Sequence, residues 1–363
     1  MSSNGRGIDR DDRAGAGAPF GECPLPLTET QAILLGHGSG GKLTSRLIEQ
    51  MMVPAFRNPA LEALDDQAIV SVHGGRLAFT TDSYVVTPIF FPGGDIGELA
   101  VNGTVNDLAM GGAEPRYLSL AFILEEGLPI ADLRRIVESA RRAAERAGVV
   151  VVTGDTKVVG RGNGDKVFIN TSGIGVVPPG VNLSSRNVRA GDAILLSGSI
   201  GDHGVAIMST REGLEFEGEL RSDTAPLHEL VASALAASRE IHAMRDPTRG
   251  GLAATLVEIA SRQKLGIEVD EKSIPIRDTV RGACEILGLD PLLVANEGKL
   301  VAFVPDRDSE AVLAAMRRHP LGSNAARIGR VTDEHPGLVL LRTPIGGARV
   351  LDLPFGEVLP RIC

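Results

Sequence analysis

The clearest pattern of hydrophobic and polar positions in the chain lies between residues 131 and 147. Apolar side chains recur there at helical spacing, and arginines and glutamates occupy the opposite face. The apolar face consists of Leu133, Ile136, Val137, Ala140 and Ala144. Pro129 precedes the segment and Gly148 follows it, as is typical of the two ends of a helix. The pattern therefore predicts an amphipathic helix over residues 131–147.

Shorter segments with helical or strand character surround this helix. Further helices are predicted at 43–56, 97–110, 204–211, 226–243, 252–264 and 308–318. Strands are predicted at 76–81, 117–124, 149–153, 167–177, 193–197, 267–269, 300–304, 326–331 and 338–341. This mixture indicates an α/β or α+β fold. A Rossmann domain is not supported, and no internal repeat is found.

The composition of the chain divides it into four segments. Residues 1–19 are rich in Gly, Ala, Asp and Arg and lack an apolar run, which favours a disordered extension over a signal peptide. A break at Pro178-Pro179-Gly180 separates two segments that each contain helices and strands, and from about Thr343 prolines and glycines prevent a helix. We expect a disordered extension at 1–27, domains at 28–180 and 181–342, and a flexible tail at 343–363.

Charge and cysteine content exclude several classes of protein. The 363 residues carry 46 acidic and 37 basic side chains, a formal net charge of −9, which argues against non-specific binding of nucleic acid. No run approaches the roughly 18 apolar residues that a membrane span needs. The cysteines, Cys23, Cys284 and Cys363, lack metal-ligand spacing, and their odd number does not suggest a disulfide scaffold. A reducing, cytoplasmic compartment is expected.

A glycine cluster that begins at Gly36 nearly matches the phosphate-binding P-loop. Gly36, Gly41 and Lys42 fit the pattern G-x-x-x-x-G-K-[ST], but Leu43 stands where a hydroxyl that binds Mg²⁺ is required. A flexible glycine lid over a ligand is a second interpretation, with Gly40 and Lys42 as its candidate cofactor-binding residues. A simple loop is the third interpretation.

Acidic residues beside Gly, Asn or Thr recur in short motifs, several of them at the ends of predicted strands. Asp is favoured at turns and helix caps, so each motif alone has an ordinary structural explanation. Oxygen atoms of Asp and Asn are also the ligands that Mg²⁺ takes while it bridges phosphates. A Mg²⁺–nucleotide site assembled from separate segments is therefore an open alternative to ordinary turns. The motifs contain Asp65, Asp66, Asp82, Asn106, Asp107, Asp155, Asp202 and Asp246.

Three further residues are candidates for catalysis. Lys157 follows a predicted strand and can bind phosphate, or act as a base once desolvated, but it can equally be a surface lysine. Glu297 precedes a predicted strand and can orient a base or simply belong to a turn. Cys363 ends the Pro/Gly-rich tail without the three following residues of a prenylation signal. A mobile thiol suits a carrier that visits several sites, and an incidental terminal residue is the alternative.

Together these segments closely resemble the HypE family of hydrogenase expression/formation proteins, within the superfamily of aminoimidazole ribonucleotide synthetase, selenophosphate synthetase and thiamine-monophosphate kinase. The resemblance runs from about His37 to Cys363. It is carried by HGSGGK, TTDSYVV, VTGDTKVV, LSGSIGDHGVAI, RDPTRGGL, ANEGKLV and the terminal PRIC, which is the most specific stretch. It implies a two-domain α/β fold of the aminoimidazole ribonucleotide synthetase (PurM-like) type. The N-terminal domain would bind ATP and pair in a homodimer.

The resemblance implies an ATP-dependent carbamoyl dehydratase. The carbamoyltransferase HypF would load the sulfur of Cys363, loss of water would give a thiocyanate, and the cyano group would pass to iron on a HypC–HypD complex for [NiFe]-hydrogenase. Lys157 and Glu297 match positions proposed as a proton-transfer pair. The implied Mg²⁺ ligands are Asp66, Asp82, Asp107 and Asp155, with Asn106, Asp202 and Asp246 as further ATP-binding residues.

Two other functions stay open at this level. One is a kinase or synthetase of the same superfamily that acts on a free small molecule. Selenophosphate synthetases usually carry a reactive Cys or selenocysteine in the glycine-rich lid, which HGSGGK lacks, and Cys23 lies well upstream. The other is a non-catalytic scaffold whose tail docks hydrogenase assembly factors. ATP turnover that depends on carbamoylated Cys363 would distinguish the dehydratase from both.

Overall fold

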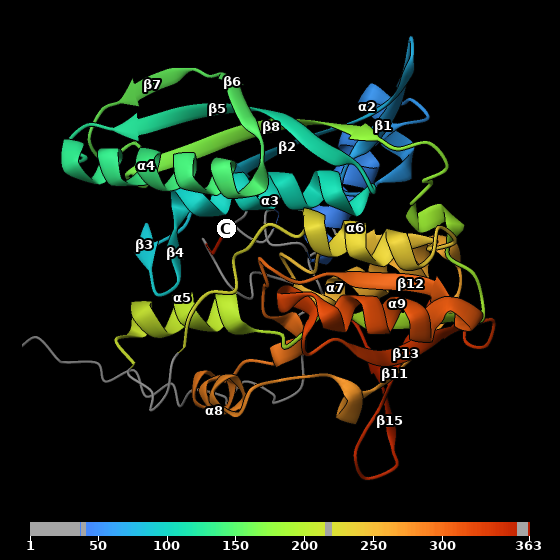
Figure 1. Cartoon of the computed structure of the whole chain (residues 1–363). Coiled ribbons are helices and arrows are strands. Elements are labelled where there is room, and N and C mark those ends of the chain that lie inside the picture. The colour runs from blue at the N-terminus through green and yellow to red at the C-terminus, as the bar shows by residue number, and fades with distance from the viewer. Residues whose placement is uncertain (1–36, 38–40, 215–219, 354–361) are drawn as a thin grey trace, which may run out of the picture. The chain divides into compact units, whose positions relative to one another are not determined.

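The computed structural model describes residue 37 and residues 41–214, 220–353 and 362–363. Three sequence predictions therefore lie outside the described residues: the disordered extension at 1–27, the candidate ligand Gly40 and the central part of the tail. The α/β prediction is confirmed, because two mixed sheets with helices account for most of the described chain (Figure 1).

The first sheet has the strand order β1-β2-β8-β5-β6, and β7 also pairs with β5. Its strands are β1 (Ala68–Val72), β2 (Gly75–Tyr84), β5 (Glu114–Glu125), β6 (Val150–Thr153), β7 (Thr156–Val159) and β8 (Val167–Val177). Helices α3 (Ile96–Met110) and α4 (Ile130–Ala147) cover one face of this sheet (Figure 1). Alternate residues of β2 follow this arrangement, since Ala78, Thr80 and Tyr84 are buried.

The other face of the first sheet is apolar and open. Phe79, Ile174 and Tyr117 lie side by side across three strands and are 46%, 38% and 50% exposed. The apolar residues on this open face are Val70, Val72, Phe79, Tyr117, Ile123, Val150, Ile174 and Val176. A contiguous apolar surface of this kind is typical of a protein–protein interface.

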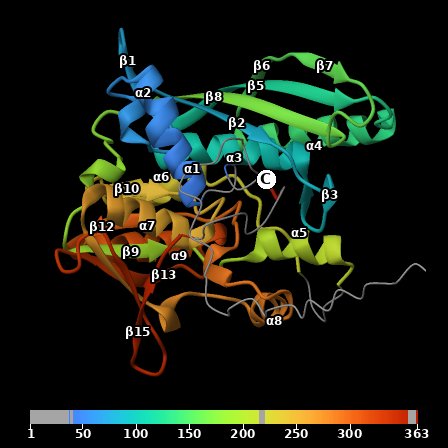
Figure 2. The same cartoon turned by 180° about the vertical axis from the view of Figure 1, so that it is seen from behind.

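The second sheet runs β10-β12-β9-β13-β11-β14-β15. Its strands are β9 (Asp192–Leu196), β10 (Ala243–Arg245), β11 (Gly266–Asp270), β12 (Val301–Pro305), β13 (Ala326–Thr332), β14 (Val339–Arg342) and β15 (Ala348–Leu351). In β9, Leu195 packs with α6 (His228–Ala237) and α9 (Asp306–Arg318), whereas Ile194 and Leu196 pack with α7 (Gly251–Gln263). Helix α9 accordingly lies on the near side of this sheet in Figure 1, and α7 lies on the near side in Figure 2, which is seen from behind. Helices therefore cover both faces of this sheet.

Helix α3 joins the first half of the described chain, which contains the first sheet, to the second half, which contains the second sheet. The amide nitrogen of Asn106 donates hydrogen bonds to the carbonyl oxygens of Ala225 (3.0 Å) and Glu297 (3.2 Å), and its amide oxygen accepts one from the Leu227 N–H (2.7 Å). Asn106 is 1% exposed, so these bonds satisfy a buried polar group. A second core beside it unites α3 with α5 (Asp202–Glu212) and α8 (Asp278–Leu287).

Several predicted elements needed correction. The helix predicted at 226–243 ends at Ala237, because Ser238 takes an extended conformation, and Ala243 instead begins β10. The strands β1, β7 and β15 and the helix α8 were not predicted. The helix predicted at 43–56 is divided into α1 (Lys42–Leu47), a π-helical segment η2 (Ile48–Met52) and α2 (Val53–Phe56). On α4, Val137 is 46% exposed, since the buried face is made largely of alanines.

The segment predicted as a flexible tail at 343–363 makes backbone contacts at both of its described ends. Residues 348–351 form β15, which pairs with β14. Ile362 forms an antiparallel bridge with Val86 and is 3% exposed. The intervening residues 354–361 lie outside the described part of the chain. The last two residues therefore pack in a core that contains residues of both halves.

A glycine in α3 allows this helix to approach α4 closely. A β-carbon at Gly97 would collide with the carbonyl oxygen of Ile136 on α4. Gly97→Ala should therefore lower the free energy of unfolding by about 1–3 kcal/mol, measured by urea denaturation. Gly282→Ala in α8 is the matched control, because a β-carbon there meets no atom within 4 Å. The control should leave stability unchanged or raise it by up to about 1 kcal/mol. Equal effects of both substitutions would contradict the close approach.

Candidate active site

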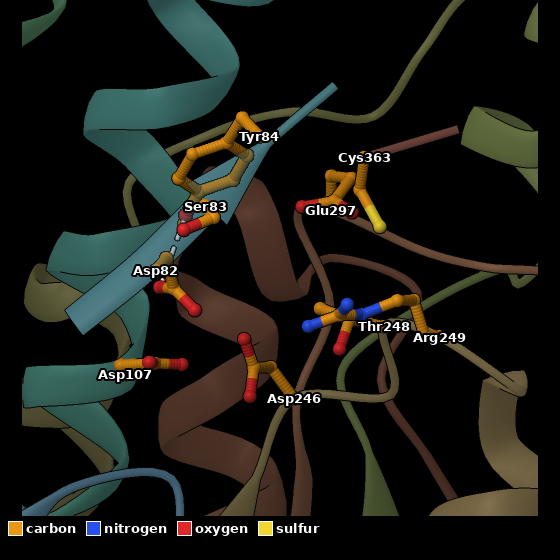
Figure 3. A pocket seen from close by; sticks show the side chains of 10 residues that line it. Asp82, Ser83, Tyr84, Asp107, Asp246, Thr248, Arg249, Glu297 and Cys363 are labelled. Carbon is orange, nitrogen blue, oxygen red and sulfur yellow. Dashed lines mark hydrogen bonds between the residues drawn. The ribbon is translucent and has the colours of Figure 1, made fainter. Parts of the chain in front are cut away.

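A small pocket lies between the two halves of the chain (Figure 3). Its cavity volume is about 40 Å³. Residues of β2 and α3 form one side, the segment after β10 and the one before β12 form the other, and Cys363 enters from the tail. The lining residues are Asp82, Ser83, Tyr84, Gly103, Asp107, Asp246, Thr248, Arg249, Glu297 and Cys363. Five of the sequence candidates, namely Asp82, Asp107, Asp246, Glu297 and Cys363, therefore meet here.

The alternation of β2 directs two of the lining side chains toward α3. Asp82 and Tyr84 are two residues apart and share a face, and the Tyr84 hydroxyl donates a hydrogen bond to Asp82 Oδ2 at 3.1 Å. Gly103 of α3 lies directly against that hydroxyl, so any side chain at this position would collide with it. The glycine that interrupts the apolar pattern of α3 thus makes room for Tyr84.

The carboxylates of the pocket repel one another. Burial raises the pKa of Asp107, and the negative charges of Asp82 and Asp246 raise it further. Thr80 Oγ1 donates a hydrogen bond to Asp107 Oδ2 at 2.7 Å, which partly offsets this effect. Burial also raises the pKa of Glu297 well above its ordinary value, with Asp246 contributing. Such a cluster favours a bound cation, because a cation would offset the repulsion.

The Cys363 thiol lies beside a carboxylate and a guanidinium group (Figure 3). Burial raises the pKa of the thiol to about 12, the Arg249 guanidinium opposes that rise, and Glu297 adds to it. The docked thiol is therefore neutral near pH 7. Glu297 Oε1 is buried without a hydrogen-bond partner among the described residues. An unpaired carboxylate oxygen next to the sulfur is available to accept a proton from a group that the sulfur carries.

Asp66 lies outside the pocket, on the far side of Thr80 from Asp107. Its carboxylate pairs with Arg245, with 2.6 Å between Asp66 Oδ1 and Arg245 Nε. The hydroxyl of Thr80 lies between Asp66 and Asp107, because its Oγ1 is 3.0 Å from the Asp66 carbonyl oxygen and 2.7 Å from Asp107 Oδ2, and its single proton is shared between these two acceptors. Asp66 Oδ2 is buried and lacks a partner among the described residues. Asp66 therefore borders the carboxylate cluster without lining the pocket.

Other sequence candidates do not line the pocket. Asp202 accepts hydrogen bonds from Arg277 Nε (2.7 Å) and Ser199 Oγ (3.0 Å), so that it forms an ion pair with Arg277. Lys42 forms an ion pair with Asp352 of the tail at 2.5 Å. Three more candidates lie outside the pocket. Asn106 bridges the two halves, and Asp65 accepts hydrogen bonds from Ser184 and Ser185. Asp155 is exposed between β6 and β7.

Lys157 lies on the opposite face of the first sheet from the pocket. β7 pairs with β5 in parallel, and Lys157 is level with Ile123. Side chains at paired positions point to the same face, and Ile123 is 43% exposed on the open face. Asp82 and Tyr84 point to the other face, toward α3. Within one chain the sheet therefore separates Lys157 from Cys363.

Five residues that line the pocket were not predicted as site residues, namely Ser83, Tyr84, Gly103, Thr248 and Arg249. Tyr84 lies in the stretch TTDSYVV, two residues after Asp82, and Arg249 lies in RDPTRGGL, three residues after Asp246. Both aspartates are predicted site residues. The available signal was thus the spacing along a strand and a turn, which places neighbours of a site residue in the same site.

Among the residues that the structure describes, no group of three or more His, Cys, Asp or Glu side chains is placed to hold a metal ion alone. Within the same part of the chain, no helix has the length and apolar character that a membrane crossing requires.

Comparisons with known proteins agree with this architecture. Models of AIR synthase related proteins match the chain, the N-terminal domain over residues 64–177 and the C-terminal domain over residues 189–340. The carbamoyl dehydratase HypE of Azotobacter vinelandii is 58% identical over 90% of this chain and 96% of its own length. A crystal structure of the hydrogenase maturation protein HypE in complex with ATP is 51% identical, with a TM-score of 0.77 over 92% of this chain and 100% of that one. A HypE–HypF complex gives a TM-score of 0.80 at 47% identity and covers 85% of this chain and 99% of the other.

The repulsion in the pocket should make stability depend on pH. Burial raises the pKa of Asp246 to about 6, with Arg245 opposing and Asp82 adding. Because the folded state holds this proton more tightly, stability is present at low pH and is lost as pH rises from ~3.9, the ordinary value, through the raised pKa. Asp246→Asn should therefore raise the free energy of unfolding of nucleotide-free protein at pH ~7.5 by about 1–3 kcal/mol and leave it unchanged at pH ~4.

Urea denaturation at the two pH values measures this effect. Asp333→Asn is the control, because Asp333 is exposed and does not line the pocket. A loss of stability in Asp246→Asn at both pH values would show that the carboxylate is stabilising, contrary to the expectation.

Proposed function

This chain belongs to the HypE family of carbamoyl dehydratases, and from that premise we propose that it dehydrates a carbamoyl group on its own Cys363 to a thiocyanate, at the expense of ATP. The observation that carries the proposal is the location of the Cys363 sulfur in a pocket with Glu297 and a carboxylate cluster. A kinase for a free small molecule would not require a cysteine of its own tail inside the site. The cyano group serves the iron of a [NiFe]-hydrogenase.

The reaction converts S–C(O)NH₂ into S–C≡N by removing the amide oxygen and both N–H protons. With ATP as co-substrate, that oxygen would leave in inorganic phosphate while ATP becomes ADP. A base must take a proton from the amide nitrogen. Glu297 suits this role, because its Oε1 has no hydrogen-bond partner among the described residues. Its raised pKa makes the ionised carboxylate a stronger base and stabilises the protonated form after transfer. Arg249 adds a positive charge beside the sulfur.

The residues present suit a nucleotide with Mg²⁺. One or two of Asp82, Asp107 and Asp246 would hold the metal ion, because Mg²⁺ at nucleotide sites normally takes one or two carboxylates together with phosphate oxygens and water. The absence of a full ligand set in the described residues is consistent with a metal that enters together with phosphates. The γ-phosphate of ATP would turn the amide oxygen into a good leaving group. Lys42, at the start of α1, is the candidate for a contact with the phosphates from the glycine-rich segment.

We further propose that the chain forms a homodimer through the open face of its first sheet. Apolar residues at the centre of that face, such as Phe79, Tyr117 and Ile174, would be covered by the same residues of a second copy. Lys157 lies on this face, so it would be available to a second chain rather than to its own. Because β7 lies at the edge of this sheet, Lys157 would reach the pocket of the second chain around that edge, and a proton-transfer pair of Lys157 and Glu297 would then combine residues of two chains.

The proposed partners follow the reaction sequence. A carbamoyltransferase of the HypF type would load the sulfur, consistent with the HypE–HypF complex of a relative. A HypC–HypD complex would accept the cyano group for iron. Both steps require the Cys363 sulfur outside the pocket, where the chain's own carboxylates do not surround it.

Glu297→Gln tests the base. The variant should bind ATP and accept the carbamoyl group at Cys363, but the rate of water loss should fall about 10²–10⁴-fold, because the amide cannot take the proton. Mass spectrometry of the C-terminal peptide measures both steps. Glu310→Gln, an exposed position on α9, should behave like the wild type, and Cys363→Ala should show neither mass change. A normal yield of thiocyanate from Glu297→Gln would remove Glu297 from the mechanism.

Mixed dimers test the position of Lys157. Lys157→Ala and Cys363→Ala chains should each be inactive as homodimers. Co-expressed with different tags, they should recover about a quarter of the wild-type dehydration, because half of the dimers would be mixed and each would hold one complete site. Purified mixed dimers without activity would show that Lys157 does not act across the interface. Activity of Lys157→Ala alone would show that it is dispensable.

A further inference from the structure

A fully buried histidine, His203 near the start of α5, contacts the end of the tail. Its Nε2 lies 2.6 Å from the carbonyl oxygen of Ile362, and its Nδ1 lies 2.8 Å from Ser222 Oγ. The ring meets Phe91 edge to face, with 5.6 Å between the ring centroids. His203 is 0% exposed and does not line the pocket, so the dehydration chemistry described above leaves it without a role.

The hydrogen-bond partners determine the tautomer of His203. A carbonyl oxygen only accepts, so Nε2 must carry a proton and donate it to Ile362. Burial lowers the pKa of His203, which keeps the ring neutral, so Nδ1 accepts the proton of the Ser222 hydroxyl. Ser222 Oγ in turn accepts the N–H of Thr224 at 3.2 Å. The hydrogen bond from Ser222 to Nδ1 thus orients the imidazole so that its Nε2–H points at the Ile362 carbonyl oxygen.

Two other contacts hold the same dipeptide. Ile362 forms a bridge with Val86, and the Val85 N–H donates to a backbone carboxylate oxygen of Cys363 at 3.3 Å. The Ile362 side chain is 3% exposed in a core that includes residues of both halves. These contacts involve the backbone and the Ile362 side chain, and they leave the sulfur of Cys363 free to carry different groups.

We infer that His203 is a positioning residue that docks the Ile362–Cys363 end of the tail and thereby sets the fraction of time that the sulfur spends inside the pocket. The inference rests on the proposed function, in which the sulfur must be inside for dehydration and outside for loading and transfer. Because His203 binds the carbonyl oxygen of the preceding residue, it docks the thiol, carbamoyl and cyano forms alike. Loss of this contact should expose the sulfur more often without altering the pocket residues.

Alkylation of the full-length protein by iodoacetamide, without ATP or any partner, measures the exposed fraction. His203→Ala should raise the rate of Cys363 alkylation about tenfold, as expected when one buried hydrogen bond of ordinary strength is lost. Ser222→Ala should raise it less, because it removes only the group that orients the ring. His203→Gln should restore slow alkylation, since its side-chain amide can donate to the same carbonyl.

Two controls separate docking from general loosening. Cys284, which is 1% exposed on α8, reports unfolding within the same sample. His242→Gln alters another largely buried histidine, which pairs with Asp192 at 2.8 Å and lies away from the tail, and it should not change Cys363 alkylation. A rise confined to Cys363 supports the inference. An equal rise at both cysteines, or no rise in His203→Ala and Ser222→Ala, overturns it.

A kinetic assay then separates docking from the proposed function. In His203→Ala, loading by the carbamoyltransferase should become faster while dehydration becomes slower, whereas a merely destabilised protein would lose both. Faster alkylation in a protein that dehydrates nothing, even as wild type, would retain the docking role and reject the proposed function. Unchanged loading and unchanged dehydration in His203→Ala would overturn the docking role alone.

Discussion

The arrangement of the site depends on the burial of helix α3 on all sides. Thirteen of its 15 residues are buried, because one flank packs on the first sheet and the other meets the second half of the chain. A helix enclosed in this way needs partners for its polar groups, and Asn106 obtains them from the segments that lead into α6 and β12. Asp107 is not fully buried, and it faces the pocket. Packing of α3 thus brings Asp107 and Glu297 into one site.

Electrostatic repulsion within that site opposes folding and favours ligand binding. Asp82, Asp107 and Asp246 share a cavity of about 40 Å³ with Glu297. Burial raises the pKa of Asp107, Asp246 and Glu297. The surrounding cores, which are almost entirely aliphatic, supply the free energy that tolerates this cost. The same repulsion would strengthen the binding of a cation that arrives with phosphate groups.

The docked cysteine has opposite requirements at different stages of the proposed reaction. Inside the pocket its pKa is raised to about 12, so the thiol is a poor nucleophile there. That state protects the sulfur from side reactions and presents its substituent to Glu297. Loading requires a thiolate and hence an undocked tail. The hydrogen bond from His203 and the bridge with Val86 hold Ile362 in the docked state, and both would break when the tail undocks.

The sequence alone determined the α/β class, the helix at 131–147 and the strand at 167–177, because these depend on local periodicity that α4 and β8 preserve. Its motifs also identified Asp82, Asp107, Asp246, Glu297 and Cys363, which the structure brings together. Only the tertiary structure decided which face of the sheet Lys157 occupies, since that depends on the register with β5 and on which face α3 covers. The pairing of Asp202 with Arg277 and the contact of His203 with Ile362 join residues 75 and 159 positions apart. No local pattern specifies such pairs, because they arise from packing of distant segments.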